Sequence, residues 1–78
     1  MTDYRPVDCD THSRYEEAIV LRRRLHLRWR TADGTLREET VRPRDVVAQH
    51  GEEFLIATDA AGEELRIRLD HIVEAAPV

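Results

Sequence analysis

Two stretches of alternating apolar and polar side chains constrain the fold of this 78-residue chain more than any other feature. In the first, Leu25, Leu27 and Trp29 alternate with polar residues, and residues 65–70 (LRIRLD) repeat the pattern. Because successive side chains of a strand point to opposite faces, both stretches are typical of strands with one buried and one solvated face. The chain therefore predicts a mainly β domain, and its length allows one small core.

Turn signals separate these strands from others. The dipeptide Asp33-Gly34 favours a hairpin directly after the first strand. Residues 36–41 form the expected returning strand, which Pro43 is expected to end because proline donates no ladder hydrogen bond. Residues 54–57 (FLIA) are apolar on both faces and so predict a central strand.

Other segments leave choices open. Residues 46–48 (VVA) form a short strand or a connecting turn, and residues 72–73 either continue the preceding strand or begin a short final one. Upstream of the sheet, apolar side chains at helical spacing predict a helix over about residues 11–22. No glycine marks the end of this helix, so it is expected to pass straight into the first strand.

One helix followed by four or five short antiparallel strands predicts a single domain with a small, partly open β-barrel. Pro6 keeps the start of the chain extended, because proline fixes its own φ and disfavours helical backbone at the preceding residue. The expected divisions are an extended arm over residues 1–10, the helix over about 11–22, the barrel over about 24–74 and a tail over 75–78.

Charge is unevenly distributed along the chain, whose net charge is −4. Residues 22–30 hold five arginines and no acid, whereas residues 31–78 hold eleven acids and five arginines. An acidic chain binds phosphate backbones poorly, so direct nucleic-acid binding is not expected and a basic partner fits better. No apolar run reaches the ~20 residues of a membrane span. With one cysteine and no signal-peptide pattern, the expected location is the cytoplasm.

Acidic side chains gather where the helix begins. The positive end of the helix dipole stabilises negative charge there. Two interpretations stay open: the acids cap the helix, or they are offered to a basic partner. Tyr4, just upstream, either packs the arm onto the sheet or makes an aromatic contact with that partner. The acids are Asp8, Asp10, Glu16 and Glu17.

The order of several short motifs resembles the Rho-binding antiterminator family (Rof). That family opens with tyrosine, proline, isoleucine or valine, cysteine and aspartate at a spacing similar to residues 4–10 (YRPVDCD). Its first hairpin resembles residues 25–34, its Glu-aromatic-Leu-Val strand resembles residues 53–56 (EFLI), and its closing strand resembles residues 65–72 (LRIRLDHI). The resemblance covers nearly the whole chain.

This resemblance implies an Sm-like fold, in which an N-terminal helix lies on a strongly bent five-stranded antiparallel barrel. It also implies a partner, the transcription terminator Rho. Such proteins bind the RNA-binding N-terminal region of Rho, block RNA loading and so inhibit termination. The chain departs from the family at residues 11–14 (THSR), where two acids are missing, which weakens the expected binding. The residues expected to bind Rho are Tyr4, Asp8, Asp10, Glu16 and Glu17.

An arginine-rich strand face supports an alternative function, an Sm-like module that binds RNA directly. If the strands that carry these arginines pair, their side chains make a basic stripe on the barrel. The plainer interpretation is a solvated face with cross-strand pairs to glutamates. The arginines are Arg24, Arg28, Arg30, Arg66 and Arg68.

No pattern in the sequence predicts an enzyme. Cys9 lies near His12, but a zinc site needs about four ligands, and no second cysteine or spaced histidine pair is present. A Cys-His nucleophile needs a third, orienting group that the sequence does not supply, so Cys9 is expected to be a small buried side chain. Charge near the open strand edges argues against a ring-forming scaffold. We therefore expect a monomeric, non-enzymatic domain without metal or cofactor.

Overall fold

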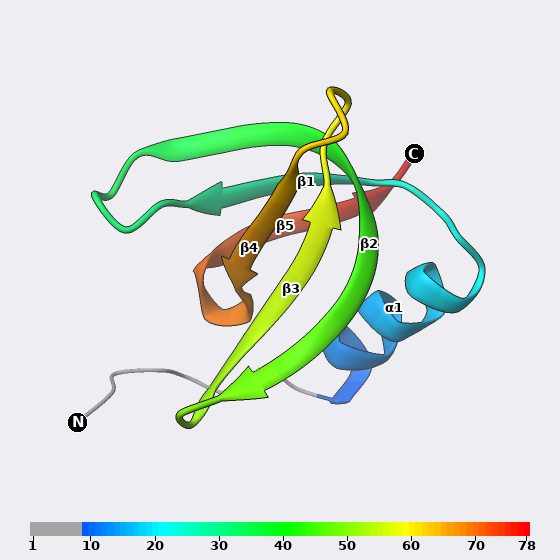
Figure 1. Cartoon of the computed structure of the whole chain (residues 1–78), viewed down its shortest axis with the longest axis horizontal. Helices are drawn as coiled ribbons and strands as arrows, with labels where there is room; N and C mark the ends of the chain where they lie inside the picture. The colour runs from blue at the N-terminus through cyan, green and yellow to red at the C-terminus, as the bar shows by residue number, and fades with distance from the viewer. Residues whose placement is uncertain (1–8) are drawn as a thin grey trace.

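The computed structural model describes residues 9–78. Within this range, one helix precedes five strands and a short 3₁₀ helix (Figure 1). The elements are α1 (Cys9–Val20), β1 (Leu25–Arg30), β2 (Leu36–Gln49), β3 (Glu52–Thr58), β4 (Glu64–Arg68), the 3₁₀ helix η1 (Leu69–His71) and β5 (Ile72–Pro77).

The five strands form one antiparallel sheet in the order β4-β3-β2-β1-β5, and its shape is set by the long, curved strand β2 (Figure 1). Residues 36–41 of β2 pair with β1, whereas residues 42–49 pair with β3. The sheet therefore bends at the middle of β2, and η1 links the two edge strands, β4 and β5. The prediction of one helix with a small, bent five-stranded antiparallel sheet is confirmed, although the sheet is not closed into a barrel.

Pro43 does not end its strand, which is a correction to the sequence prediction. β2 continues through Pro43, and residues 46–48 belong to the same strand rather than to a separate strand or turn. The pairing register with β3 shifts between Pro43 and Asp45. Such a bulge interrupts the ladder locally, so a residue without an N–H is tolerated there. The bulge lies at the bend of β2, and a bulge bends its strand and increases the local twist.

The end of the chain also differs from the expected tail. β5 extends to Pro77 and pairs with β1, with Ala75 opposite Leu27 and Pro77 opposite Leu25. Of the two alternatives for residues 72–73, the start of a final strand is correct. The small side chains of residues 75–76 gave no alternating apolar signal, so pairing with the available edge of β1 decides their conformation.

The helix ends through a left-handed residue rather than passing straight into the strand. Arg22 has φ +55°, a conformation that glycine usually supplies at this position. The Arg22 N–H donates to the carbonyl of Ile19 at 3.2 Å, and the Arg23 N–H donates to the carbonyl of Ala18 at 2.9 Å. This pair of hydrogen bonds is a Schellman motif, which satisfies the last carbonyls of the helix.

The core is formed by α1 and the bent sheet. Tyr15 and Ala18 of α1 belong to one buried cluster with side chains of β1, β2, β3, β4 and η1, and partly buried side chains of β5 pack against it. Burial raises the pKa of Tyr15, an effect that nearby Arg14 partly opposes. No helix within residues 9–78 is long and apolar enough to cross a membrane. The other members of the buried hydrophobic cluster are Leu25, Leu27, Trp29, Val41, Leu55, Ala57, Ile67 and Leu69.

Candidate binding groove

A groove of about 280 Å³ opens where the end of β1, the start of β2, β3, β4 and η1 approach one another. The bend of β2 creates it, because β1 and β4 are not neighbours in the sheet but contribute to the same wall. We call it the arginine groove, after the four arginines that line it. Its ionisable side chains are Arg30, Arg37, Arg66, Arg68 and His71.

Two of these arginines lie over aromatic rings. The guanidinium carbon of Arg37 is 5.1 Å from the ring centroid of Trp29, and that of Arg66 is 4.3 Å from the centroid of Phe54. Strand register explains both contacts, because Arg37 is directly opposite Trp29 and Arg66 is diagonal to Phe54. The negative face of an aromatic ring attracts a cation. Each ring therefore stabilises the charge of its arginine at the wall of the groove.

Arg68 has a different role, because carboxylates surround it. Its Nε and Nη2 donate to the two carboxylate oxygens of Asp70 at 2.9 and 2.6 Å. Its Nη1 is also 3.7 Å from a carboxylate oxygen of Glu52. The fork-to-fork contact with Asp70 joins β4 to η1. Arg68 thus supports the wall of the groove rather than offering its charge to a ligand.

Arg30 and Arg66 make no ion pair with any carboxylate of residues 9–78. Arg30 donates weakly to the carbonyl of Gly34 at 3.5 Å, and Arg66 donates to the side-chain oxygen of Gln49. Arg37 has one acidic partner, Glu39. Two of the four groove arginines, Arg30 and Arg66, therefore have neutral oxygens rather than carboxylates as hydrogen-bond partners, and this arrangement favours an anion.

The turn between β1 and β2 forms one rim of the groove, and the carboxylate of its acid, Asp33, accepts hydrogen bonds from within the turn. Thr31 lines the groove, and its hydroxyl donates to the carboxylate of Asp33. The same carboxylate oxygen accepts the backbone N–H of Thr35 at 3.1 Å. These hydrogen bonds, that from the Thr31 hydroxyl first, lower the pKa of Asp33 to about 2. The Asp33 carboxylate is therefore hydrogen-bonded within its own turn.

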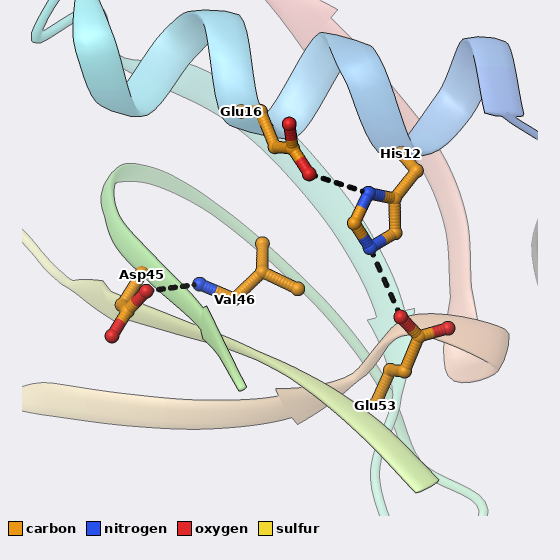
Figure 2. A network of polar contacts seen from close by, with 5 residues as sticks. All are labelled: His12, Glu16, Asp45, Val46 and Glu53. Carbon is orange, nitrogen blue, oxygen red and sulfur yellow. Dashed lines mark hydrogen bonds and ion pairs between the residues drawn. The ribbon is translucent and has the colours of Figure 1, made fainter. Parts of the chain in front are cut away.

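On the other side of the molecule, α1 is joined to β3 by a polar cluster, shown in Figure 2. His12 Nδ1 lies 2.8 Å from a carboxylate oxygen of Glu16, and its Nε2 lies 3.0 Å from one of Glu53. Nearby, Asp45 accepts the backbone N–H of Val46 at 2.8 Å. An imidazole facing two carboxylates donates to both only when both nitrogens carry protons. We call His12, Glu16 and Glu53 the histidine cluster.

The acids predicted to bind a partner do not form one patch. Tyr4 and Asp8 lie outside the described residues. Glu16 belongs to the histidine cluster and faces β2 and β3, whereas Glu17 lines a cleft between α1 and β5. Asp10 is exposed in the first turn of α1. The helix therefore turns neighbouring Glu16 and Glu17 towards different sides of the molecule.

The predicted arginine stripe is only partly assembled. Arg30, Arg66 and Arg68 meet in the groove, although their strands do not pair with one another. Arg28 instead lies opposite Glu38, with Nε 3.7 Å from its carboxylate. Arg24 lines a different cavity.

Four groove residues with aromatic or ionisable side chains were not predicted from the sequence. The hairpin signal at residues 33–34 held part of the information, because a turn centred there places Arg37 opposite Trp29. The sequence contained no comparable signal for Phe54 and His71, because their position depends on the bend of β2. The missed residues are Trp29, Arg37, Phe54 and His71.

A metal centre finds no support in the described part of the chain. Residues 9–78 contain no group of three or more histidine, cysteine, aspartate or glutamate side chains that could hold a metal ion. The arginine groove itself contains a single potential metal ligand, His71, among its cations. Its donor set suits an anion.

Comparison with protein families matches residues 10–77 to the WYL domain, a match that extends from α1 through β5. Among solved structures, proteasome accessory factor B/C (PafBC) of Arthrobacter aurescens is similar in fold, with a TM-score of 0.77 over 94% of this chain. Sequence identity is 19%, and the match spans 12% of the length of that protein. A search of characterised protein sequences returned no significant match.

These findings correct the assignment made from short motifs. The chain is not a member of the Rho-binding antiterminator family, because the WYL domain accounts for residues 10–77. The function and partner implied by that resemblance, inhibition of termination through Rho, are wrong for the same reason. The motifs quoted from residues 25–34, 53–56 and 65–72 are short fragments that fall mainly on β-strands and their turns, a pattern that unrelated antiparallel sheets share.

Proposed function

This chain belongs to the WYL domain family, and we propose that it is a binding module whose arginine groove takes a phosphate-bearing ligand with a planar base. A nucleotide and a short stretch of single-stranded nucleic acid both have this chemistry. We propose further that the module is non-enzymatic and works in the cytoplasm as part of a larger protein. The matched region of PafBC, which is 12% of that protein, supports a modular role.

One observation carries the proposal: two arginines lie on aromatic rings in the same groove. Arg37 covers Trp29 at 5.1 Å and Arg66 covers Phe54 at 4.3 Å. Single-stranded nucleic acids are bound by combining cations for the phosphates with flat π surfaces for the bases. A guanidinium plane also stacks on a base, so Arg66 can serve both needs.

The net charge of the chain does not oppose this function. The net charge counts all acids equally, and from it no direct binding of nucleic acid was expected. In the folded domain, Glu16 and Glu53 face His12, Asp33 is held by its own turn, and Asp70 is held by Arg68. The groove is lined by four arginines and no acid, and two of them, Arg30 and Arg66, make no ion pair with a carboxylate of residues 9–78. Phosphate binding depends on this local arrangement of charge.

Fluorescence anisotropy with a labelled ten-nucleotide single strand tests the proposal. We expect Arg66→Gln to weaken binding by about 10-fold or more, because a charge-assisted hydrogen bond contributes about 1.5–3 kcal/mol. The matched control is Arg44→Gln, which removes an equal charge from an exposed position outside the groove. The control is expected to bind within about twofold of the unmodified domain.

Competition then separates the two sources of the ligand. Displacement of the strand by mononucleotides at similar concentration would indicate a nucleotide site, whereas displacement by longer strands alone would indicate a nucleic-acid site. The proposal is overturned if the domain binds neither ligand at low salt, or if Arg66→Gln and Arg44→Gln weaken binding equally.

A further inference from the structure

A second pair of arginines lies far from the groove residues in the sheet, where the connection from α1 enters β1 (Figure 1). Arg24 immediately precedes β1, and Arg42 lies on β2. Leu25 is opposite Val41 in the antiparallel ladder, so the next positions outward place Arg24 opposite Arg42. Arg42 is in turn opposite Thr58 of β3. Three neighbouring segments therefore carry two arginines and a hydroxyl in one row.

This juxtaposition is electrostatically unfavourable in the absence of a ligand. Both arginines are exposed, and neither makes an ion pair with a carboxylate of residues 9–78. Like charges directly opposite each other in a sheet are destabilising. Elsewhere in the same pair of strands, Arg28 lies opposite Glu38, so an acid can be placed across from an arginine in this ladder.

A cavity of about 230 Å³ separates these side chains from the turn after β3. Thr58 lines it beside Arg42, and Asp59 is the one acid in its wall. A carboxylate oxygen of Asp59 accepts the backbone N–H groups of Ala61 and Glu63, both at 2.9 Å. The acid is thus engaged in shaping its turn, and the side-chain donors around the cavity are two guanidinium groups and the hydroxyls of Thr40 and Thr58, of which that of Thr40 lies 3.4 Å from Nδ1 of His26.

We propose that Arg24, Arg42 and Thr58 form an oxyanion site that binds a phosphate group. Guanidinium forks match the geometry of phosphate oxygens and donate two hydrogen bonds each, and a threonine hydroxyl supplies a further donor. Binding neutralises the repulsion between the two arginines, so ligand and fold stabilise each other. The site shares no residue with the arginine groove and does not depend on the function proposed for it.

Nuclear magnetic resonance provides the direct test. A ¹H–¹⁵N spectrum of the domain is recorded during titration with sodium phosphate, against sodium chloride at equal ionic strength. We expect phosphate to shift the amides of residues 24, 42 and 58–60, with saturation, and chloride to leave them in place. In Arg42→Gln these shifts should need at least about 10-fold more phosphate, whereas Arg44→Gln should behave like the unmodified domain.

Thermal unfolding gives a second readout that does not require resonance assignment. In phosphate-free buffer of low ionic strength, Arg42→Gln is expected to melt at a higher temperature than the unmodified domain, because one repelling charge is gone. Added phosphate should raise the melting temperature of the unmodified domain and of Arg44→Gln by more than that of Arg42→Gln, which keeps the arginine groove and the general stabilising effect of phosphate but lacks this site. Equal effects of phosphate on all three proteins, or no saturable shift near residues 24 and 42, would overturn the proposal.

Two organic phosphates distinguish the sources of the bound group. Phenyl phosphate stands for a phosphomonoester and dimethyl phosphate for the diester of a nucleic-acid backbone. Saturable shifts from dimethyl phosphate would assign the site to a backbone, whereas shifts from phenyl phosphate and inorganic phosphate alone would assign it to a free phosphate or monoester. Failure of all three ligands at millimolar concentration would contradict an oxyanion site.

Discussion

The arginine groove and the histidine cluster both hold several ionisable side chains, but they differ in whether oppositely charged partners surround those side chains. In the histidine cluster, His12 lies between Glu16 and Glu53, with both contacts at 3.0 Å or less. In the groove, Arg66 lies on Phe54 and bonds to a neutral amide. Each ionisable side chain of the cluster has a partner within the cluster, and these contacts join α1 to β3. In the groove, Arg30 and Arg66 have no acidic partner within residues 9–78.

The comparison shows that a count of charges along the chain does not locate a binding surface. The most acidic segment by sequence, at the start of the helix, includes an acid that the fold uses for its own packing. The arginine-rich segments divide in the same way, because Arg68 is held by Asp70 while Arg66 has no acidic partner within the described residues. Partners within the fold, rather than residue type, decide which charge is available to a ligand.

The largest stability effect is expected from Asp70→Asn, which separates supporting from ligand-binding arginines within the groove. Asp70 and Arg68 are 9% and 17% exposed, so the change leaves a largely desolvated guanidinium without its bidentate partner. We expect the free energy of unfolding to fall by about 2 kcal/mol, measured by urea denaturation. Binding of the ten-nucleotide strand by the folded variant should not weaken, because Arg66 and Arg37 stay in place.

A matched control for this prediction is Glu64→Gln, which removes one negative charge from an exposed position on β4, the strand that carries Arg68. It is expected to change stability by no more than about 0.5 kcal/mol. If Glu64→Gln lost as much stability as Asp70→Asn, the removal of any negative charge, rather than the loss of the contact with Arg68, would be responsible.

A smaller effect is expected from His12→Ala, which tests the other half of the comparison. The variant removes two charge-assisted contacts from a side chain that is 29% exposed, so we expect a loss of about 1 kcal/mol in the free energy of unfolding. Ligand affinity should stay within about twofold. Ser13→Ala, at an exposed position of the same helix, is the control. A drop in ligand affinity with His12→Ala would contradict the proposal that the groove binds the ligand and the histidine cluster only stabilises the fold.

The smallest effect concerns Asp33 on the rim of the groove. Its pKa in the folded domain is about 2, below the ordinary value of 3.8, so its ionised form stabilises the fold. That contribution is present above about pH 4 and is lost as the pH falls through about 2. We therefore expect Asp33→Ala to be less stable than the unmodified domain at pH 7, with the difference shrinking between pH 4 and pH 2. A difference that stays constant over this range would contradict the assignment.

Much of the fold could be predicted from the sequence because alternation and turn residues are local signals. Leu25, Leu27 and Trp29 predicted β1 correctly, and the Asp-Gly dipeptide at residues 33–34 predicted the hairpin that follows. The signals that failed were those that the fold overrides. Pro43 is tolerated at a bulge, and residues 75–76 become a strand because β1 offers them an edge.

The candidate site was harder to predict because it depends on the bend of β2. Arg30 and Arg66 were recognised as possible ligand-binding residues, but on the assumption that their strands pair. Phe54 was recognised only as part of a central strand, and its contact with Arg66 follows from the diagonal register between β3 and β4. Sequence patterns specify faces of strands, whereas the distance between strands that are not neighbours requires the three-dimensional structure.

The central claim is that the groove, and not the acidic helix, is the binding surface. The most direct measurement is a ¹H–¹⁵N spectrum of the domain titrated with a short single-stranded oligonucleotide at low salt. Our account predicts saturable shifts at residues 29–37, at Phe54 and at residues 65–71, with the indole N–H of Trp29 among them and little change along α1. Shifts confined to α1 and the histidine cluster, or no saturable shifts at all, would contradict it.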